Sequence, residues 1–399
     1  MKKLIFLLLC ALAISACKHT TNQAASYTVI PIDPSAAVRS LNLSLIFEKI
    51  EYVQLETPEG HLIGDISRII THGDRFYILD ARISRSVFCF NRDGSFLHEI
   101  NRQGRGPGEY IELQAITIDH EKSRLLLYSE TPRKVIAFDL DGNFLDERPL
   151  DFIATDLAFV GEGRVAFFCD YATNNAFLQK STLPNLILAD AGNYTVQETS
   201  LRFPASRNVQ ALTSLMSNFS SHPDGVSLLV PYNDTLYHIA PDRSEAAYLF
   251  DFGKMKKSKF FYSMLADEET TLKEMNSYIL TNDACNVMQC IESEYHVYLG
   301  YQHKDAFHFA FYDKRDSTLH DVGRAYKPGA DMGMLVNDID GSPVPAIYGS
   351  DGRSFFSIIQ PQELLQQAET MHPESLDLKR VIDTANEEDN PIIAVLVPR

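Results

Sequence analysis

The sequence predicts an all-β fold built from repeated four-stranded units, on three observations. A ten-residue pattern centred on Asp-Gly occurs at residues 88–97 and returns at residues 136–145, so that Gly142 follows Gly94 by 48 residues. Short apolar segments with strand-like alternation recur at similar intervals. The chain ends in an apolar strand, residues 391–397, with no partner after it. Self-similarity of this period is typical of β-propellers, and the number of units predicts six blades.

The Asp-Gly pattern marks a hairpin in each of the first two units. Glycine adopts the positive φ that a tight turn needs, and the flanking aromatic residues alternate between the two faces of a strand. Later units turn at residues 190–192, 241–243 and 313–316, where the pattern is weaker.

A second apolar strand precedes each hairpin and gives the blade count. Its six copies are residues 76–80, 125–128, 165–168, 226–230, 296–299 and 354–358. Another short apolar run lies upstream of most copies and fits the innermost strand. Each unit therefore has the four strands of a propeller blade.

Two segments depart from strand periodicity. Residues 254–278 have helical apolar spacing, and Pro361 and Pro373 each open a helical stretch within blade six. Residues 47–55 form a strand before blade one, which we expect to pair with residues 391–397 and close the ring. Two sequential β-sandwiches, the competing fold, would leave both terminal strands unexplained. We therefore expect one propeller over residues 40–399.

The N-terminus has the features of an export signal. Lys2 and Lys3 precede an apolar run that is too short to span a bilayer, and the segment ends in Ser15-Ala16-Cys17. This resembles the lipobox of bacterial lipoproteins, in which cleavage precedes a lipid-modified cysteine. We expect a signal peptide at residues 1–16, lipid on Cys17 and a tether over residues 17–39. An ordinary signal peptide is the alternative. No acidic run follows Cys17, which favours an anchor in the outer membrane with the protein facing the periplasm.

Charge and composition limit the partners. The net charge is −17 and 45% of residues are hydrophobic, so the chain is globular, and nucleic acid is not expected to bind it. We expect the protein to contact the membrane only through its N-terminal lipid anchor. A basic cluster, Lys254, Lys256, Lys257 and Lys259, is interpreted as a solvated helix face.

Cysteine and histidine spacing predicts no metal site. Four cysteines lie in apolar runs: Cys89, Cys169, Cys285 and Cys290. Only Cys285 and Cys290 are close in sequence, and both a disulfide between them and two free thiols agree with their spacing. No cofactor is predicted. A calcium ion in the central channel is the one alternative.

The segments at residues 76–80, 87–94 and 104–110 resemble the NHL repeat and the six-bladed β-propeller lipoproteins of Gram-negative bacteria. The Asp389-Asn390-Pro391 sequence before the last strand is similar too. The resemblance implies a propeller in the cell envelope and transfers no catalytic residue. The chain has no tryptophan, so the sialidase motif is absent.

Propeller topology indicates where a ligand binds. The loops between the second and third strands and the connections between blades emerge on one face. The candidate residues on this face are Arg82, Arg85, Arg105, Tyr110, Arg133, Tyr171, Asn174, Asn233 and His303. We expect a binding or assembly module for a protein or small molecule, rather than an enzyme. The alternative is a metal-dependent hydrolase or lyase with its site in the central channel.

Overall fold

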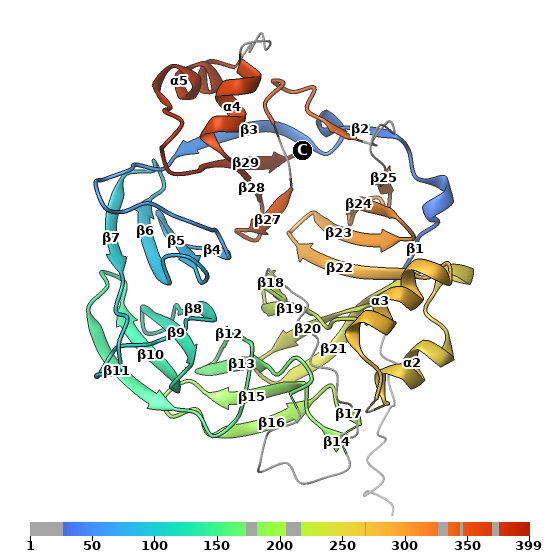
Figure 1. Cartoon of the computed structure of the whole chain (residues 1–399), viewed down its shortest axis with the longest axis horizontal. Coiled ribbons are helices and arrows are strands. Elements are labelled where there is room, and N and C mark those ends of the chain that lie inside the picture. Colours follow the sequence, from blue (N-terminus) through green and yellow to red (C-terminus); the bar gives the residue numbers. More distant parts are fainter. Residues whose placement is uncertain are drawn as a thin grey trace, which may run out of the picture.

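The computed structural model describes residues 27–172, 182–204, 217–267, 269–325, 334–343, 346–368 and 375–399. Six sheets of four or five strands stand around a central axis, and the chain visits them in order around the ring (Figure 1). The predicted six-bladed propeller is confirmed.

Blades one to three follow the chain without interruption. Blade one is β4 (Arg68–His72), β5 (Arg75–Asp80), β6 (Ser86–Asn91) and β7 (Phe96–Ile100). Blade two is β8 (Ala115–Asp119), β9 (Arg124–Glu130), β10 (Arg133–Asp139) and β11 (Phe144–Pro149). Blade three is β12 (Asp156–Gly161), β13 (Arg164–Phe168), β15 (Leu186–Asp190) and β16 (Val196–Ser200).

Blades four to six carry the additions. Blade four is β18 (Phe219–His222), β19 (Gly225–Leu229), β20 (Thr235–Ala240) and β21 (Arg243–Asp251), with β1 (Thr28–Pro31) on its outer edge. Blade five is β22 (Cys285–Glu292), β23 (His296–His303), β24 (Ala306–Asp313) and β25 (Leu319–Ala325). Blade six is β27 (Ile347–Ser350), β28 (Phe355–Ile359), β29 (Ile392–Pro398) and β3 (Phe47–Gln54).

Among the described residues, two small sheets and four helices lie outside the blades. The small sheets pair β14 (Thr182–Leu183) with β17 (Phe203–Pro204), and β2 (Ser40–Asn42) with β26 (Met334–Val336). Between blades four and five lie α2 (Lys259–Leu265) and α3 (Leu272–Thr281); α4 (Pro361–Ala368) and α5 (Leu376–Thr384) are inserted in blade six. Short 3-10 turns are η1 (Pro34–Ala36), η2 (Leu43–Leu45) and η4 (Gly253–Met255).

The strand order gives the propeller two different faces. Connections from blade to blade, and loops between second and third strands, lie on one end, which we call the crossover face. All tight hairpins lie on the opposite end, which we call the hairpin face. Both pairs of helices belong to connections of the crossover face.

Side-chain alternation produces the core between blades. In β5, Phe76 and Ile78 pack with blade six, whereas Tyr77 and Leu79 pack with blade two. Because successive side chains of a strand point to opposite faces, each blade is apolar on both sides. The described residues accordingly form six apolar clusters, one at each junction of neighbouring blades.

The ring is closed as the sequence predicts. β29 pairs antiparallel with β28 on one side and with β3 on the other, with Ile393 opposite Val53. The hairpin glycine Gly94 has φ of +91° and lies against this closure, because a Cβ atom there would stand 2.1 Å from the Gln54 carbonyl oxygen. The Asp-Gly turn of blade one thus needs glycine for its conformation and for its packing.

Residues 28–54 form what we call the N-terminal strap, which follows the outer edges of three blades. β1 lies parallel to β21 of blade four, Val38 bridges to Val322 of blade five, and β3 is the outer strand of blade six. Part of the segment expected to be a tether, Thr28–Pro31, is therefore a strand of the propeller. Its pairing partner lies more than 200 residues away in sequence, so local pattern could not reveal it.

The helical insertion before blade five is fixed by a buried cation. Lys257 is 3% exposed, and its Nζ pairs with Asp234 and donates to the Cys285 carbonyl oxygen at 3.0 Å. The interpretation of the whole basic cluster as a solvated face is therefore wrong for Lys257, although Lys254, Lys256 and Lys259 are exposed. An ion pair at the start of the insertion ties it to blade four.

The four cysteines expected in apolar strands are all buried free thiols. Burial raises the pKa of Cys169 to about 12, so this thiol stays protonated. No helix in the described ranges has both the length and the apolar character needed to cross a membrane.

A buried histidine at the junction of blades five and six makes stability depend on pH. His296 is 2% exposed, and burial lowers its pKa to about 4, despite the opposing effect of Asp313. Unfolded histidine has a pKa of about 6.5, so between these values only the unfolded state binds the proton. We expect the free energy of unfolding to fall as the pH decreases from 6.5 to 4, by up to about 3 kcal/mol.

Urea denaturation at several pH values measures this effect, with His296→Asn as the comparison. The variant lacks the titrating ring, so its stability should change less over the same range. Equal slopes for the two proteins would contradict the assignment to His296.

Candidate ligand-binding site

The crossover face holds the predicted candidate residues but does not gather them into one site. Arg82, Arg85 and Arg105 are exposed, and Arg82 lies 3.6 Å from the Asp65 carboxylate. Arg133 is half-buried at the start of β10. Asn174 lies outside the described residues. Arg82 and Arg85 share the loop between β5 and β6, and Arg105 lies in the connection between blades one and two. None of these four arginines lines a pocket described below.

Two of the candidates have structural partners. Tyr110 is fully buried, and its hydroxyl donates to the carbonyl oxygens of Arg85 at 2.9 Å and Ile100 at 3.0 Å. Burial raises its pKa to about 12. Tyr110 therefore locks the first crossover to blade one and presents no surface to a ligand. His303 pairs with Asp283 at 2.7 Å, beside α3.

Tyr171 and Asn233 do come together, in a pocket of about 460 Å³ between blades three and four. We call this the tyrosine pocket. Its lining residues are Tyr171, Asn185, Leu201, Arg202, Phe203, Pro204, Val230, Tyr232, Asn233, Tyr237, Tyr262, Leu265 and Ala266. The wall thus combines four tyrosines with two amides and one guanidinium.

Equivalent loops of two blades supply the first tyrosines. Tyr171 and Tyr232 each stand three residues after the end of the second strand of their blade, and each has a φ of +61°. A left-handed conformation costs a residue with a side chain about 1–2 kcal/mol, so both loops hold their tyrosine in a strained turn. The Tyr171 hydroxyl donates to the Pro231 carbonyl oxygen at 2.9 Å, which joins the two loops.

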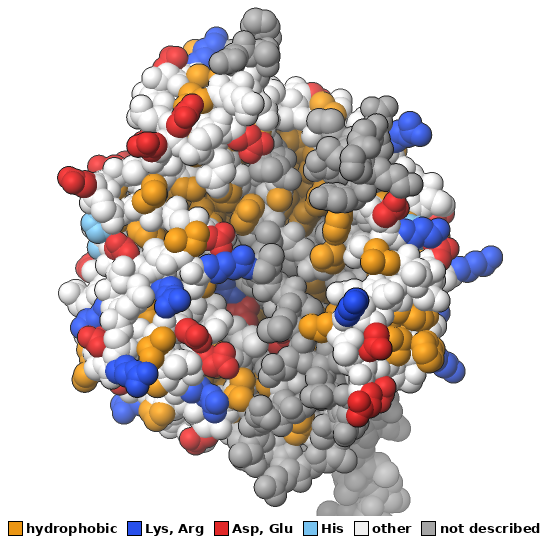
Figure 2. All heavy atoms as spheres, viewed as in Figure 1, with side chains coloured by type: hydrophobic (Ala, Val, Ile, Leu, Met, Phe, Trp, Pro, Cys, Tyr) orange, Lys and Arg blue, Asp and Glu red, His pale blue; other side chains and the backbone are white. Residues whose placement is uncertain are grey.

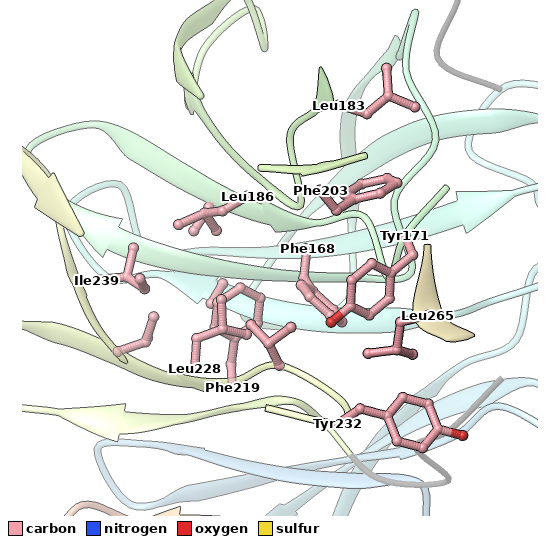
Figure 3. Close-up of a cluster of buried hydrophobic side chains, with 14 of the residues drawn as sticks. Phe168, Tyr171, Leu183, Leu186, Phe203, Phe219, Leu228, Tyr232, Ile239 and Leu265 are labelled. Atoms are coloured by element: carbon pink, nitrogen blue, oxygen red, sulfur yellow. The ribbon is translucent and has the colours of Figure 1, made fainter. Parts of the chain in front are cut away.

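The apolar junction of blades three and four forms the floor of the pocket. Figure 3 shows Tyr171 between Phe203 and Leu265, with Tyr232 on the far side of Leu265. The Tyr171 and Phe203 rings meet edge to face, with centroids 5.2 Å apart. The helix α2 therefore completes the pocket by contributing Leu265 and, one turn earlier, the 45% exposed Tyr262.

Polar groups of the pocket are placed by short-range hydrogen bonds. Asn233 donates from Nδ2 to the Tyr237 hydroxyl at 3.0 Å. Asn185 is 1% exposed, and its Oδ1 accepts from the Tyr171 backbone nitrogen at 2.8 Å. Its Nδ2 has no hydrogen-bond partner among the described residues. A buried amide donor without a partner is costly, so it is a group that a bound acceptor would satisfy.

The central channel is a second cavity, of about 280 Å³, lined by the inner strands of all six blades. None of its described lining residues is Asp or Glu. A calcium ion prefers carboxylate and carbonyl oxygens, so the lining side chains do not make a calcium site.

One arginine of the channel lining bonds to groups from several blades. Arg68 donates from Nη1 to the carbonyl oxygens of Ile116 at 2.7 Å and Leu157 at 3.3 Å. Its Nη2 bonds to the Asp156 carboxylate and to the Ser217 hydroxyl. These groups belong to blades two and three and, for Ser217, to the segment just before β18. A single guanidinium therefore joins blades one, two and three to the segment that leads into blade four.

Sequence reasoning missed Arg68, Asp156 and Asn185. Arg68 and Asp156 are the first residues of inner strands that are otherwise mostly apolar. A charged residue at the start of such a strand is a sequence signal for a buried ion pair. Asn185 lies in a loop without any distinguishing pattern. Figure 2 shows Lys and Arg side chains mixed with Asp and Glu on the face in view, so neither sign forms a dominant patch there.

Comparison with one solved structure supports the fold. A protein of Bacteroides fragilis NCTC 9343 named as an exported protein is 17% identical, with a TM-score of 0.74, over 94% of this chain and 100% of that one. A member of the DUF4221 family from Bacteroides vulgatus ATCC 8482 is 11% identical, with a TM-score of 0.47, over 88% and 97%. No curated protein sequence matches the chain.

A sequence family matches nearly the whole chain. Its description is "Domain of unknown function (DUF4934)", and the match covers residues 27–397. That description mentions no NHL repeat, so the NHL resemblance stays a prediction. The match spans the N-terminal strap and all six blades, and the chain therefore belongs to the DUF4934 family.

Proposed function

We propose that the protein is a lipid-anchored binding module of the cell envelope and that its ligand occupies the tyrosine pocket. The observation that carries the site is the buried Asn185 amide, whose Nδ2 has no partner among the described residues, in a pocket walled by four tyrosines. Pockets of this kind combine apolar walls with a few placed polar groups.

The N-terminal sequence supports the envelope location. Cys17 follows the small residues Ser15 and Ala16 after an apolar run, as in lipoprotein signals. Tyr27 lies ten positions after Cys17, so lipid on Cys17 would hold the propeller within about 35 Å of the bilayer. The exported-protein name of the similar Bacteroides fragilis structure agrees with this location. We propose that the lipid anchor lies in the outer membrane and that the propeller faces the periplasm.

The wall chemistry favours a neutral ligand with polar rings. The partly exposed rings of Tyr237 and Tyr262 provide stacking area, and amide and hydroxyl groups provide hydrogen bonds, as carbohydrate recognition needs. Arg202 is the one formal charge among the described lining residues, and it already donates to the Thr199 hydroxyl at 2.7 Å and to the Thr182 carbonyl oxygen at 3.2 Å. We therefore propose a neutral oligosaccharide rather than an anion.

The channel is not the site we propose. A metal-dependent hydrolase or lyase there would need carboxylates around the ion, and the described lining offers none.

Titration with neutral hexasaccharides tests the pocket directly. Cellohexaose, maltohexaose and chitohexaose are the probes, and tyrosine fluorescence can follow binding because the chain has no tryptophan. We expect Tyr262→Ala to weaken binding by about two- to tenfold, since one aromatic contact contributes about 0.5–1.5 kcal/mol. Tyr262 is partly exposed, so its removal should not unfold the protein.

Tyr27→Ala is the matched control. Tyr27 is also 45% exposed and lies just before β1 at the outer edge of blade four, away from the pocket. Saturable binding that only Tyr262→Ala weakens supports the proposal. Failure of all three sugars to bind, or equal loss in both variants, contradicts it.

A further inference from the structure

A second group of functional side chains lies on the hairpin face, between blades four and five. His222 ends β18, His238 lies near the end of β20, and Glu292 ends β22. One potential ligand atom from each residue lies within 4.8 Å of the others. We propose that these three residues, which we call the His-His-Glu triad, bind a divalent transition metal such as Zn²⁺.

The spacing of the triad is close to that of a coordinated metal. His238 Nε2 and Glu292 Oε2 are 2.8 Å apart, and the His222 and His238 ring centroids are 3.9 Å apart. Around a tetrahedral zinc ion with bonds of about 2.1 Å, ligand atoms stand about 3.4 Å from each other. Replacing the hydrogen bond by two metal bonds therefore needs only a small outward shift of these side chains.

The carboxylate of the triad is held in place by other groups. Glu292 is 1% exposed; its Oε1 accepts from Lys314 Nζ at 2.5 Å, and Ser227 donates to its Oε2. The Tyr248 hydroxyl lies 3.4 Å from Oε1. Metal-binding carboxylates are commonly oriented by such outer hydrogen bonds, which leave one oxygen directed at the metal.

The donor set selects the class of metal. Lys314 already balances the Glu292 charge, so the triad attracts a dication less through charge than through its two imidazoles. Imidazole favours Zn²⁺, Ni²⁺ and Cu²⁺, whereas Ca²⁺ and Mg²⁺ require several oxygen ligands. We therefore expect zinc to bind and calcium not to bind.

Binding has one identifiable cost at His222. Its Nδ1 accepts a hydrogen bond from the Asp224 backbone nitrogen at 3.2 Å. Coordination through Nδ1 would use that lone pair, and coordination through Nε2 would place the proton on Nδ1, so this bond is lost either way. The bond is exposed, and water can replace it, so the cost is small.

Solvent reaches the triad through His222. This residue lines both the central channel and a groove of about 590 Å³ on the hairpin face. Three protein ligands leave the fourth tetrahedral position of zinc for water or another ligand. The proposed metal is therefore accessible, and it lies on the face opposite the tyrosine pocket, so the two proposals are independent.

The test is metal titration of the purified protein after chelator treatment. Co²⁺ serves as the probe because its visible absorption reports tetrahedral coordination, and Zn²⁺ and Ca²⁺ are measured by calorimetry at pH 7.5. We expect one Co²⁺ or Zn²⁺ per chain, an increased melting temperature with Zn²⁺, and no binding of Ca²⁺. His222→Asn should weaken Zn²⁺ binding at least about tenfold, since even outer-shell changes cost 10–100-fold.

His120→Asn is the matched control, because His120 lines the same channel and the same groove but is outside the triad. His222 is only half-buried, so its variant should fold, and its melting temperature without metal checks this. If Co²⁺ or Zn²⁺ does not bind stoichiometrically, the triad is an ion-pair contact between blades. Binding that survives His222→Asn and His238→Asn would equally overturn the proposal.

Discussion

Replacing Arg68 with methionine should lower the free energy of unfolding by about 3–5 kcal/mol, as removal of one partner from a buried ion pair generally does. The Asp156 side chain is only 6% exposed, so its carboxylate would stay buried without its cation. The change would also remove the hydrogen bonds that join Arg68 to blades two and three. Guanidinium denaturation followed by circular dichroism measures the effect.

Two comparisons separate this cause from a general loss of an arginine. Arg82→Met removes an exposed cation from the same blade and should change stability by no more than about 0.5 kcal/mol. Arg68→Met combined with Asp156→Asn should recover much of the loss, because the amide carries no charge. A single variant as stable as Arg82→Met would show that the network contributes little.

Lys257→Met should have an effect of similar size, about 3–5 kcal/mol, because it leaves Asp234 buried beneath the helical insertion. Burial already raises the pKa of Asp234, and Lys257 opposes that shift. Without the lysine the folded-state pKa should rise further above the unfolded value. The destabilisation should then be largest at neutral pH and smaller near pH 4, where the unfolded carboxyl is also protonated.

Lys259→Met is the control, since Lys259 belongs to the same basic cluster and is exposed. It should leave the denaturation midpoint nearly unchanged. If Lys257→Met and Lys259→Met behave alike, or if the loss at Lys257 does not depend on pH, the buried pair is not what fixes the insertion.

The blades could be predicted from sequence because their signals are local. An Asp-Gly turn between alternating apolar segments specifies a hairpin within about ten residues, and the same turn then repeats. Ring closure could be predicted because residues 47–55 and 391–397 are both strands without a neighbouring partner, and pairing them with each other removes both exposed edges. β1 had no comparable signal, since only Ile30 of its four residues is buried and its partner β21 is remote.

The site was less predictable because it depends on how neighbouring blades meet. Topology placed the candidate loops on the crossover face, and Tyr171 and Asn233 share a pocket there. Tyr110 looked the same in sequence, but it is fully buried at the junction of blades one and two, whereas the buried Tyr171 still lines a pocket. Whether a pocket remains beside a loop tyrosine is decided by the packing of residues far apart in the chain, and a single sequence does not contain that information in readable form.

Ring closure has a consequence for the order in which the blades form. β29 lies between β28 and β3, and it follows β3 by more than 330 residues in the chain. The outer strand of blade six is therefore synthesised before blades one to five, and the strand that pairs with it is synthesised after them. While the other blades form, β3 has no partner in its own sheet, so blade six is the last blade that can be completed. Conversely, a proteolytic cut that removes β29 would reopen the whole ring at its seam.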